Sequence, residues 1–318
     1  MTTKKISILI TAYNEQEVLH HLYERLYKLA GQNTNYAFEF MFVNDGSRDK
    51  TLEIIAKYAA KDPRVAFINL SRNFGKETAM IAGLDHVTGD ATVIIDADLQ
   101  DPPELIPQMI EYWQQGYDDV FAKRSSRAGE SWLKKASSKY FYKILQRSTD
   151  IPIQRDTGDF RLLDRRCVEA LRQMRESQRY TKGMFSWIGY KKKEILYERD
   201  ARMAGTTKWN YFKLIDLAIE GIVSFTTAPL RISTGVGMMV SLLAFGYIIY
   251  LVIRTMLFGT DLAGYPSMMA VILFLGGVQL LSLGVIGEYI ARIFNETKSR
   301  PLYFIEQYHK SSTLKREK

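Results

Sequence analysis

Short apolar runs alternate with helical patterns over roughly the first half of the chain. The runs are nearly continuous in apolar residues, as expected for strands buried on both faces of a sheet. They cover Ile6–Ile10, Phe38–Val43, Val65–Leu70, Thr92–Asp96 and Val120–Lys123. Helical spacing of apolar residues follows over Val18–Ala30, Thr51–Ala60, Glu77–Val87 and Leu105–Gln115. This alternation predicts βαβ units, and therefore an α/β fold with a mostly parallel sheet.

Two long segments nearer the C-terminus carry no charged residue, Ile232–Ile253 and Leu262–Gly287. A helix of about 22 residues is about 33 Å long and spans a hydrocarbon core of about 30 Å. The sequence therefore predicts two transmembrane helices, at about 232–256 and 264–288; a buried hairpin of a soluble domain is the alternative. Basic residues flank the pair at Arg231 and Arg292, so the positive-inside rule places the N-terminal domain and the C-terminus in the cytoplasm.

The region before the first predicted span contains two aromatic, apolar segments, Met184–Ile188 and Tyr211–Phe225. Such segments next to basic residues are typical of helices that lie on a bilayer surface. Ordinary helices packed against the protein core are the alternative. We therefore divide the chain into an α/β domain (1–180), interfacial helices with a connecting strand (181–230), two membrane spans (231–292) and a cytoplasmic C-terminal tail (293–318).

The charge balance narrows the class of partner only in combination with these segments. A net charge of +8 and a pI of about 9.3 suit nucleic acid, anionic membranes and phosphate-bearing ligands equally. Two membrane spans and acidic residues at strand ends disfavour a nucleic-acid-binding protein. The single cysteine, Cys167, excludes an internal disulfide, and no histidine stands at metal-ligand spacing from it, which argues against zinc.

Polar clusters follow three of the predicted strands at the points where the strands end. They are Thr11–Glu15, Val43–Ser47 and Asp96–Asp101. Ligands of open α/β sheets bind outside the carboxyl ends of the strands, so the clusters predict a ligand site there. The Asn44–Ser47 sequence, taken alone, is also a common turn.

The pair Asp96 and Asp98 is the candidate metal site. Residues i and i+2 of a strand point to the same side, about 7 Å apart. One carboxylate can then bind a divalent cation while the other holds a metal-bound water or a ligand hydroxyl. Mg²⁺ and Mn²⁺ prefer oxygen ligands and share them with substrate phosphates. A lone D-x-D arises by chance, but its position at the end of a buried strand, before Gln100 and Asp101, strengthens the signal.

The motifs together resemble the family 2 glycosyltransferases, which have a GT-A fold. The resemblance rests on TAYNE (Thr11–Glu15), VNDGS (Val43–Ser47), DADLQDPPE (Asp96–Glu104), Arg72–Lys76 and Asp156–Asp164. With two C-terminal spans, the chain resembles polyprenyl-phosphate glycosyltransferases, a group that includes bactoprenol glucosyltransferases and is similar to dolichyl-phosphate mannose synthase. The Q-x-x-R-W motif of processive synthases is absent, which disfavours a polysaccharide polymerase.

The resemblance implies a function for each group of site residues. The nucleotide-sugar donor would be bound by Thr11, Tyr13, Glu15, Asp45, Ser47, Lys76 and Asp96. Asp96 and Asp98 would hold Mg²⁺ or Mn²⁺. The catalytic group would be Gln100, Asp156, Asp159 and Arg161, with either Asp156 or Asp159 acting on the acceptor.

Basic residues are candidates for the acceptor phosphate, because guanidinium groups grip phosphate with paired hydrogen bonds. They are Arg124, Arg127, Arg202 and Lys208. A solvated basic face attracted to anionic lipid is the alternative, and we prefer it for Lys191–Lys193.

The implied reaction is transfer of a hexose, best matched by glucose from UDP-glucose, to undecaprenyl phosphate with inversion at the anomeric carbon. GDP-mannose or another UDP-sugar as donor, a hydroxyl acceptor, and an inactive GT-A scaffold that binds lipid head groups are the alternatives. Glycines in the second span, such as Gly276 and Gly284, permit close helix packing, so a homo-oligomer stays open.

Overall fold

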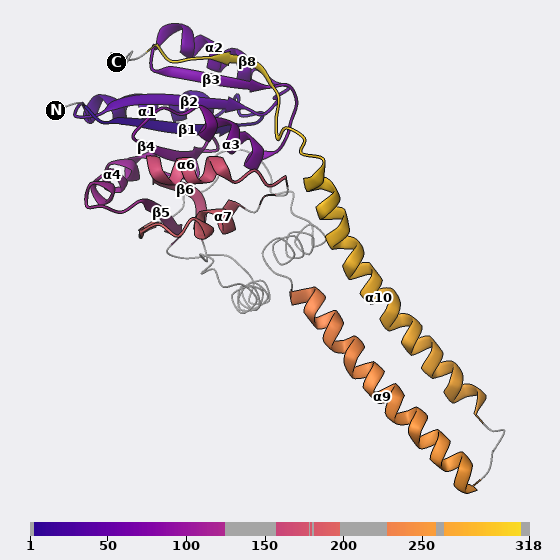
Figure 1. The fold of residues 1–318 in the computed structure, drawn as a ribbon. Coiled ribbons are helices and arrows are strands. Elements are labelled where there is room, and N and C mark those ends of the chain that lie inside the picture. Colours follow the sequence, from indigo (N-terminus) through magenta and orange to yellow (C-terminus); the bar gives the residue numbers. More distant parts are fainter. Residues whose placement is uncertain are drawn as a thin grey trace. The chain divides into compact units, whose positions relative to one another are not determined.

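The computed structural model describes residues 3–124, 157–177, 179, 181–197, 228–258 and 264–312. The chain divides into two units (Figure 1). The sheet domain comprises Met1–Gln146, Ile151–Lys213 and Pro301–Lys318, and the hairpin unit comprises Arg147–Asp150 and Leu214–Arg300. The hairpin unit is therefore an insertion between segments of the sheet domain.

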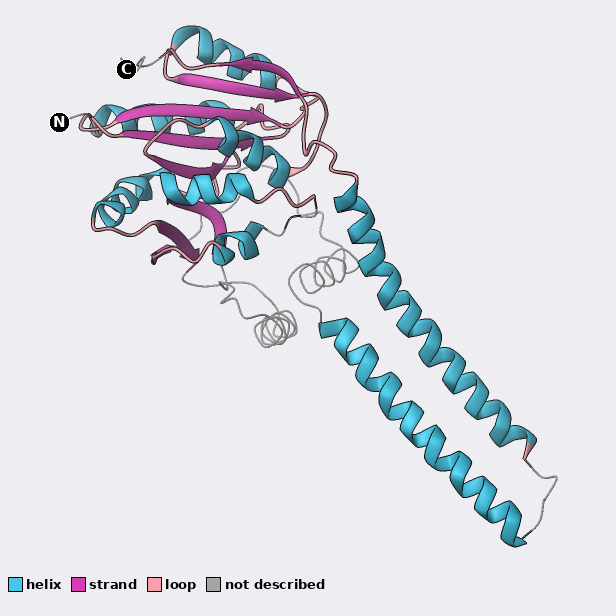
Figure 2. Cartoon of the chain, viewed as in Figure 1, coloured by secondary structure: helices cyan, strands magenta, loops and turns pink. Residues whose placement is uncertain are grey.

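The described residues form a sheet of eight strands in the order β7-β5-β6-β4-β1-β2-β3-β8. Figure 2 shows strands in magenta and helices in cyan. The strands are β1 (Lys5–Ala12), β2 (Ala37–Asn44), β3 (Val65–Leu70), β4 (Ala91–Asp96), β5 (Asp119–Arg124), β6 (Thr157–Asp164), β7 (Lys192–Tyr197) and β8 (Ile305–His309). The first four strands along the chain pair in parallel, and β5 pairs in parallel with β7. Among the strands that the structure describes, only β6 and β8 run antiparallel to their neighbours.

Helices cover both faces of the sheet. They are α1 (Leu19–Gln32), α2 (Thr51–Lys61), α3 (Lys76–His86), η1 (Pro103–Leu105), α4 (Ile106–Gln114), α6 (Arg165–Gln173) and α7 (Thr181–Trp187). The alternate β1 residues Ile6, Ile8 and Ile10 pack in one core with buried residues of α1, α2 and α4. Leu9 faces the opposite way, and a Cβ on Gly83 of α3 would lie 2.0 Å from it, so α3 approaches the sheet closely at a glycine.

The predicted α/β fold with a mostly parallel sheet is confirmed. The five predicted strands correspond to β1–β5, and the four predicted helices correspond to α1–α4. The predictions did not include β6, which enters antiparallel between β4 and β5.

The predicted interfacial helix at Met184–Ile188 is wrong. The structure has α7 there, with Met184 and Phe185 fully buried in the sheet domain. The Phe185 ring centroid lies 3.7 Å from the guanidinium carbon of Arg161, and the following strand, β7, pairs with β5. Residues 181–197 therefore belong to the sheet domain. The second predicted interfacial helix, Tyr211–Phe225, lies outside the described residues.

The predicted C-terminal tail at 293–318 is also wrong over the part that the structure describes. The second hairpin helix continues to Thr297, and β8 then pairs antiparallel with β3. The backbone N–H of Ser71 donates to the carbonyl of Phe304 at 3.0 Å. This strand covers an edge of β3 that would otherwise have unpaired backbone groups.

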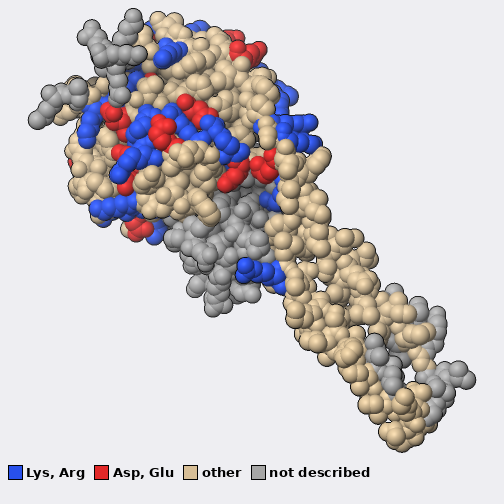
Figure 3. All heavy atoms as spheres, in the orientation of Figure 1, with Lys and Arg blue, Asp and Glu red and all other residues tan. Residues whose placement is uncertain are grey.

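The hairpin unit contains two long helices, α9 (Ala228–Phe258) and α10 (Tyr265–Thr297). Within them, Pro229–Tyr247 and Phe274–Thr297 are long and apolar enough to cross a membrane. At most 6% of either stretch is buried, unlike the core helices of a soluble protein. Figure 3 shows an almost uncharged surface along the hairpin, whereas charged side chains crowd the visible face of the sheet domain.

Candidate functional site

The three polar clusters predicted from the sequence meet at the carboxyl end of the sheet. Thr11 of β1 is in register with Asp96 of β4, and Ala12 is in register with Asn44 of β2. The turns that follow these strands therefore leave the sheet side by side. The predicted convergence of the clusters is confirmed.

The first two turns are tied to each other by hydrogen bonds. The Asn14 N–H donates to Ser47 Oγ at 2.9 Å, and the Asn14 side-chain oxygen accepts from the Arg48 N–H at 2.8 Å. Asn14 has a φ of 57°, a left-handed conformation that asparagine tolerates better than most residues. The Glu15 N–H donates to the Thr51 hydroxyl at 2.9 Å. Tyr13 directly precedes Asn14 in the first turn. It is 43% exposed, so its ring is accessible to a ligand.

Asp45 ties the second turn to the segment that leads into α3. Its two carboxylate oxygens accept from the backbone N–H groups of Phe74 at 2.7 Å and Gly75 at 2.9 Å. Burial raises the pKa of Asp45, and these two N–H groups oppose that shift. The next residue, Gly46, has a φ of 64°, and a Cβ on it would lie 2.4 Å from the Arg72 carbonyl carbon. Only glycine fits at this position.

Lys76, the first residue of α3, bridges two carboxylates. Its ammonium lies 2.6 Å from Asp96 Oδ2 and 2.6 Å from Asp159 Oδ2. Asp159 comes from β6, the antiparallel neighbour of β4, so the unpredicted strand supplies it. Thr11 adds a longer contact of 3.4 Å from its hydroxyl to Asp96 Oδ1.

The charges of this cluster determine its titration. Burial disfavours the Lys76 ammonium, but the charges of Asp96 and Asp159 outweigh burial and raise the pKa of Lys76. Burial, together with the charges of Asp159 and Asp98, raises the pKa of Asp96, and Lys76 opposes that shift. Burial would also raise the pKa of Asp159, yet Lys76 lowers it below the ordinary aspartate value. Lys76 therefore keeps Asp159 ionised.

The turn after β4 holds the second carboxylate of the predicted metal pair. Leu99 has a left-handed φ of 58°, and the Gln100 N–H donates to Asp98 Oδ1 at 3.2 Å. Gln100 is 8% exposed, and its side-chain oxygen has no hydrogen-bond partner among the described residues. Asp101 accepts from the Tyr197 hydroxyl at 2.6 Å. Asp101 therefore holds the turn to β7.

These residues fit a divalent cation that is shared with a ligand. The described residues contain no group of three or more His, Cys, Asp or Glu side chains that would form an all-protein metal cage. Asp96 and Asp98 supply oxygen donors, and the buried oxygen of Gln100 is unpaired. Mg²⁺ and Mn²⁺ prefer oxygen ligands, and their other coordination positions can be filled by phosphate oxygens. The metal assignment therefore stays a prediction that the geometry permits.

Arg161 does not line the site, and its predicted catalytic role is wrong. The side chain is fully buried and its guanidinium lies 3.0 Å from Asp119 Oδ2. The guanidinium carbon lies 5.8 Å from the Phe121 ring centroid and 3.7 Å from that of Phe185. A buried guanidinium held in this way cannot contact a substrate. Arg161 instead packs β6 against β5, and so supports the strand that carries Asp159.

Five predicted site residues lack a structural account. Asp156, Arg127, Arg202 and Lys208 lie outside the described residues. Arg124 is the last residue of β5, but its side chain also lies outside the described part of the structure. The acceptor side of the site stays a prediction.

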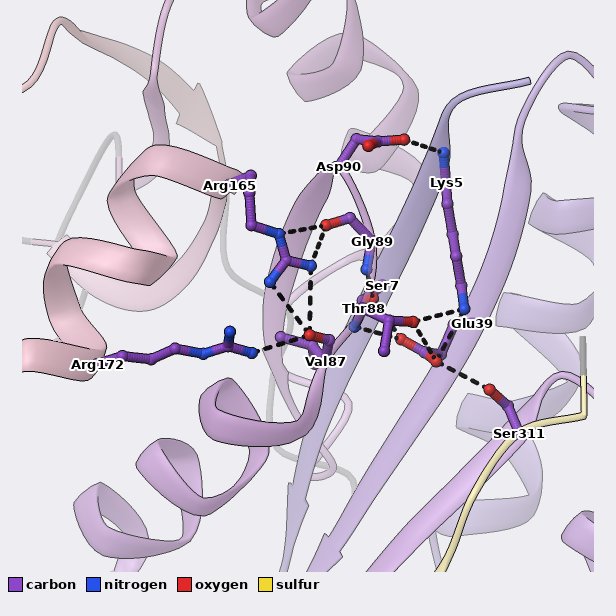
Figure 4. A network of polar contacts seen from close by, with 10 residues as sticks. All are labelled: Lys5, Ser7, Glu39, Val87, Thr88, Gly89, Asp90, Arg165, Arg172 and Ser311. Atoms are coloured by element: carbon purple, nitrogen blue, oxygen red, sulfur yellow. Dashed lines mark hydrogen bonds and ion pairs between the residues drawn. The ribbon is translucent and has the colours of Figure 1, made fainter. Parts of the chain in front are cut away.

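A second polar network lies at the amino end of the same sheet (Figure 4). Glu39 of β2 is 1% exposed and accepts hydrogen bonds from Lys5, Ser7, Thr88 and Ser311. Burial would raise the pKa of Glu39, but these donors lower it below the ordinary value. Each carboxylate oxygen is occupied, which leaves no acceptor for a ligand.

Two arginines of α6 complete this amino-end network. Arg165 donates to the carbonyl of Gly89 at 2.8 Å, and Arg172 donates to the carbonyls of Leu84 at 2.7 Å and Val87 at 2.9 Å. They satisfy carbonyl groups at and beyond the C-terminal end of α3, where cations are favoured. The amino-end network is therefore structural.

Comparison with known proteins identifies matches to both units. Residues 7–172 match the model for glycosyl transferase family 2, and residues 228–293 match that for the GtrB C-terminal hairpin. An uncharacterized glycosyltransferase of Synechocystis is 48% identical over 95% of both chains. A bactoprenol glucosyl transferase of Shigella phage SfX is 46% identical over 95% of this chain and 99% of its own.

A homologue in Escherichia coli K12, described as a prophage bactoprenol glucosyl transferase homolog, is 45% identical over 96% of this chain and 100% of its own. Among solved structures, mannosyl-3-phosphoglycerate synthase from Rubrobacter xylanophilus matches with a TM-score of 0.48. It is 15% identical and covers 68% of this chain and 71% of its own.

Proposed function

Since the chain belongs to glycosyl transferase family 2, we propose that this glycosyltransferase moves glucose from UDP-glucose to a polyprenyl phosphate at a membrane surface. The observation that carries the proposal is the Lys76–Asp96–Asp159 cluster at the carboxyl end of the sheet, in a chain that also has a long apolar hairpin. Relatives named bactoprenol glucosyl transferases support the lipid acceptor and the sugar.

The donor binds, in this proposal, across the turns that follow β1, β2 and β4. The exposed ring of Tyr13 stacks on the base, and the turn fixed by Asp45 carries the ribose side of the nucleotide. A bound Mg²⁺ or Mn²⁺ supplies positive charge for the diphosphate leaving group. Asp96 and Asp98 would hold the ion.

The acceptor phosphate is the nucleophile. One of its oxygens forms the new bond to the anomeric carbon, the bond from that carbon to the diphosphate oxygen breaks, and the configuration inverts. A phosphate monoester has a second pKa of about 6 and is mostly a dianion at neutral pH. A strong general base is therefore unnecessary. Asp159, kept ionised by Lys76, helps to orient the acceptor.

The position of β8 supports a membrane arrangement in which both ends of the hairpin lie on one side. The segments before and after the hairpin belong to the same sheet domain, and β8 pairs with β3. A hairpin that spans the membrane must then return to the side on which it entered. The basic residues that flank it favour the cytoplasmic side.

The test is a transfer assay with the full-length protein in detergent. The protein is supplied with radiolabelled UDP-glucose, undecaprenyl phosphate and Mg²⁺ or Mn²⁺, and label in the organic phase is counted. We expect label that requires both the lipid phosphate and the metal, and that disappears with a chelator. Label from a different UDP-sugar or from GDP-mannose would keep the reaction and change the donor. No transfer from any donor would contradict the proposal and favour a scaffold that only binds lipid head groups.

A further inference from the structure

We propose that Glu306, on the strand that follows the hairpin, is a positioning residue for the donor-binding turn Asn44–Ser47. The inference rests on the proposed function, because that function assigns the turn to the nucleotide donor. Glu306 does not belong to any motif of the sequence analysis. It reaches the turn through two buried amides.

The connection is a short line of hydrogen bonds across the last strands of the sheet. Glu306 Oε2 accepts from Asn69 Nδ2 at 2.8 Å, and Asn69 Oδ1 accepts from Asn44 Nδ2 at 2.7 Å. Asn69 is 6% exposed and Asn44 is 1% exposed, so both amides are shielded from water. Asn44 ends β2 and directly precedes Asp45, which holds the turn against Phe74 and Gly75.

The strand pairing is irregular where Glu306 makes this contact. Asn69 is in register with Gln307 and Leu70 with Ile305, with a register shift between Asn69 and Leu70. Bulges of this kind redirect a side chain relative to a regular ladder. Glu306 is the residue skipped by the register, and its carboxylate meets the Asn69 amide.

A carboxylate fixes the direction of the whole line. An ionised glutamate only accepts hydrogen bonds, whereas an asparagine amide can be turned either way. Glu306 therefore keeps the Asn69 NH₂ toward itself and the Asn69 oxygen toward Asn44. The Asn44 oxygen then has no hydrogen-bond donor among the described residues. A buried acceptor without a partner is unfavourable. If Glu306 is lost, the Asn69 amide can therefore turn over and donate to the Asn44 oxygen.

Loss of the negative charge of Glu306 and loss of its positioning role predict opposite changes in the affinity for the donor. A nucleoside diphosphate is an anion, so removal of a glutamate would strengthen its binding if charge alone mattered. Loss of the fixed amide orientation beside Asp45 would weaken its binding. The sign of the change therefore separates a positioning residue from a distant charge.

The experiment compares Glu306→Gln, Glu306→Ala and Glu306→Lys in the full-length protein, with UDP as the probe in calorimetric titrations. Glutamine still accepts from Asn69, so we expect its Kd to stay within about twofold of the wild type. Alanine should raise the Kd about five- to tenfold, because the line loses its terminal acceptor. Lysine can only donate, so it should turn both amides and raise the Kd further. In transfer assays the donor KM should rise while kcat changes little.

Control variants distinguish two explanations of a Glu306 effect. Glu306 could orient the Asn44–Ser47 turn, or it could only help the C-terminal segment to dock on the sheet. Gln307→Ala removes a neighbouring exposed side chain of β8. Ser311→Ala removes the bond from Ser311 to Glu39 at the other end of the sheet, 2.9 Å long. Both should leave the Kd for UDP unchanged, and thermal unfolding should show whether any variant loses stability. Asn69→Ala should reproduce the loss of Glu306→Ala, and the double variant should be no worse than either.

Several outcomes overturn the proposal. Wild-type affinity or tighter binding in Glu306→Ala or Glu306→Lys contradicts it, as does an equal loss in Ser311→Ala. Additive losses in the double variant with Asn69→Ala also contradict it. If the wild type transfers no sugar and binds no UDP, the proposed function fails and this inference fails with it. If the wild type binds UDP and the Glu306 variants bind it with the same Kd, the inference alone fails.

Discussion

Both ends of the central sheet carry buried carboxylates, but the two ends differ in how completely their polar groups are hydrogen-bonded. At the amino end, Glu39 is surrounded by donors, and the arginines of α6 cover the carbonyl groups beyond α3. At the carboxyl end, the carboxylates of Asp96 and Asp159 share one ammonium. The buried amide oxygens of Asn44 and Gln100 lack a partner among the described residues.

The difference separates the buried polar groups that are structural from those that we propose are held for a ligand. A satisfied network stabilises the fold and leaves nothing for a substrate. Clustered like charges, left-handed residues such as Asn14 and Leu99, and unpaired acceptors cost stability and persist where function requires them. Substitutions at the amino end should therefore affect stability, and those at the carboxyl end should affect turnover.

The largest expected effect is at the carboxyl end. Asp98→Ala should lower the rate of sugar transfer by about 10²–10³-fold, because the cation that Asp98 is proposed to hold would no longer neutralise the leaving diphosphate. Its thermal unfolding should match the wild type. Asp90→Ala, which removes a carboxylate that binds the Lys5 N–H at the amino end, is the control and should keep its turnover. Near-normal transfer by Asp98→Ala would contradict the metal assignment.

The converse test is Glu39→Ala at the amino end. Removal of this carboxylate leaves the Lys5 ammonium, the Ser7 hydroxyl and the Thr88 N–H without their acceptor. We expect a loss of about 3 kcal/mol in the free energy of unfolding. Chemical denaturation followed by circular dichroism would measure it. At a temperature where the variant stays folded, kcat should be close to wild type, and a large fall in kcat would break the distinction between the two ends.

Two glycines offer a matched pair. A Cβ on Gly46 would meet the Arg72–Asn73 backbone at 2.4 Å, and a Cβ on Gly89 would meet the Ser7 nitrogen at 2.6 Å. Alanine at either position should cost about 2 kcal/mol of stability. Only Gly46→Ala should also weaken UDP binding, by about tenfold, because it displaces the turn that is proposed to bind the donor. Equal effects of both variants on the Kd for UDP would show that the comparison is wrong.

The smallest effect is a pH dependence at Glu39. Its pKa is lower in the folded protein than the ordinary value of 4.5, so its charge adds stability above that pH. This contribution disappears as the pH falls through the folded pKa. Glu39→Gln should be less stable than the wild type by about 1 kcal/mol at neutral pH. The gap should narrow below about pH 4.5 in parallel denaturation series. A gap that is independent of pH would exclude Glu39 titration as its source.

Local patterns predicted the parts of the fold that are determined by neighbours in sequence. Apolar runs and helical spacing placed β1–β5 and α1–α4, and the strand-end motifs located the carboxyl-end cluster. Periodicity could not tell a buried aromatic helix from an interfacial one, which explains the error at α7.

Pairing between distant segments was the part that the sequence did not reveal. Asn69 and Glu306 are 237 residues apart, and β8 is short and mostly polar. The burial of Arg161 depends on Asp119 of a neighbouring strand and on Phe185 of α7. The resemblance of Asp156–Asp164 to a family motif suggested a catalytic role for Arg161. It could not show that Asp119 already neutralises the Arg161 charge.

The position of β8 after the two long helices also determines when the sheet is completed during synthesis of the protein. A ribosome makes β1–β7 first, then both long helices, and only then the strand that covers β3. Until that moment the nascent sheet has an open edge, which is a template for pairing with other chains. A chain that stopped after Thr297 would have both apolar helices, but its β3 edge would stay uncovered. Completion of the sheet therefore depends on a segment that is translated after both apolar helices.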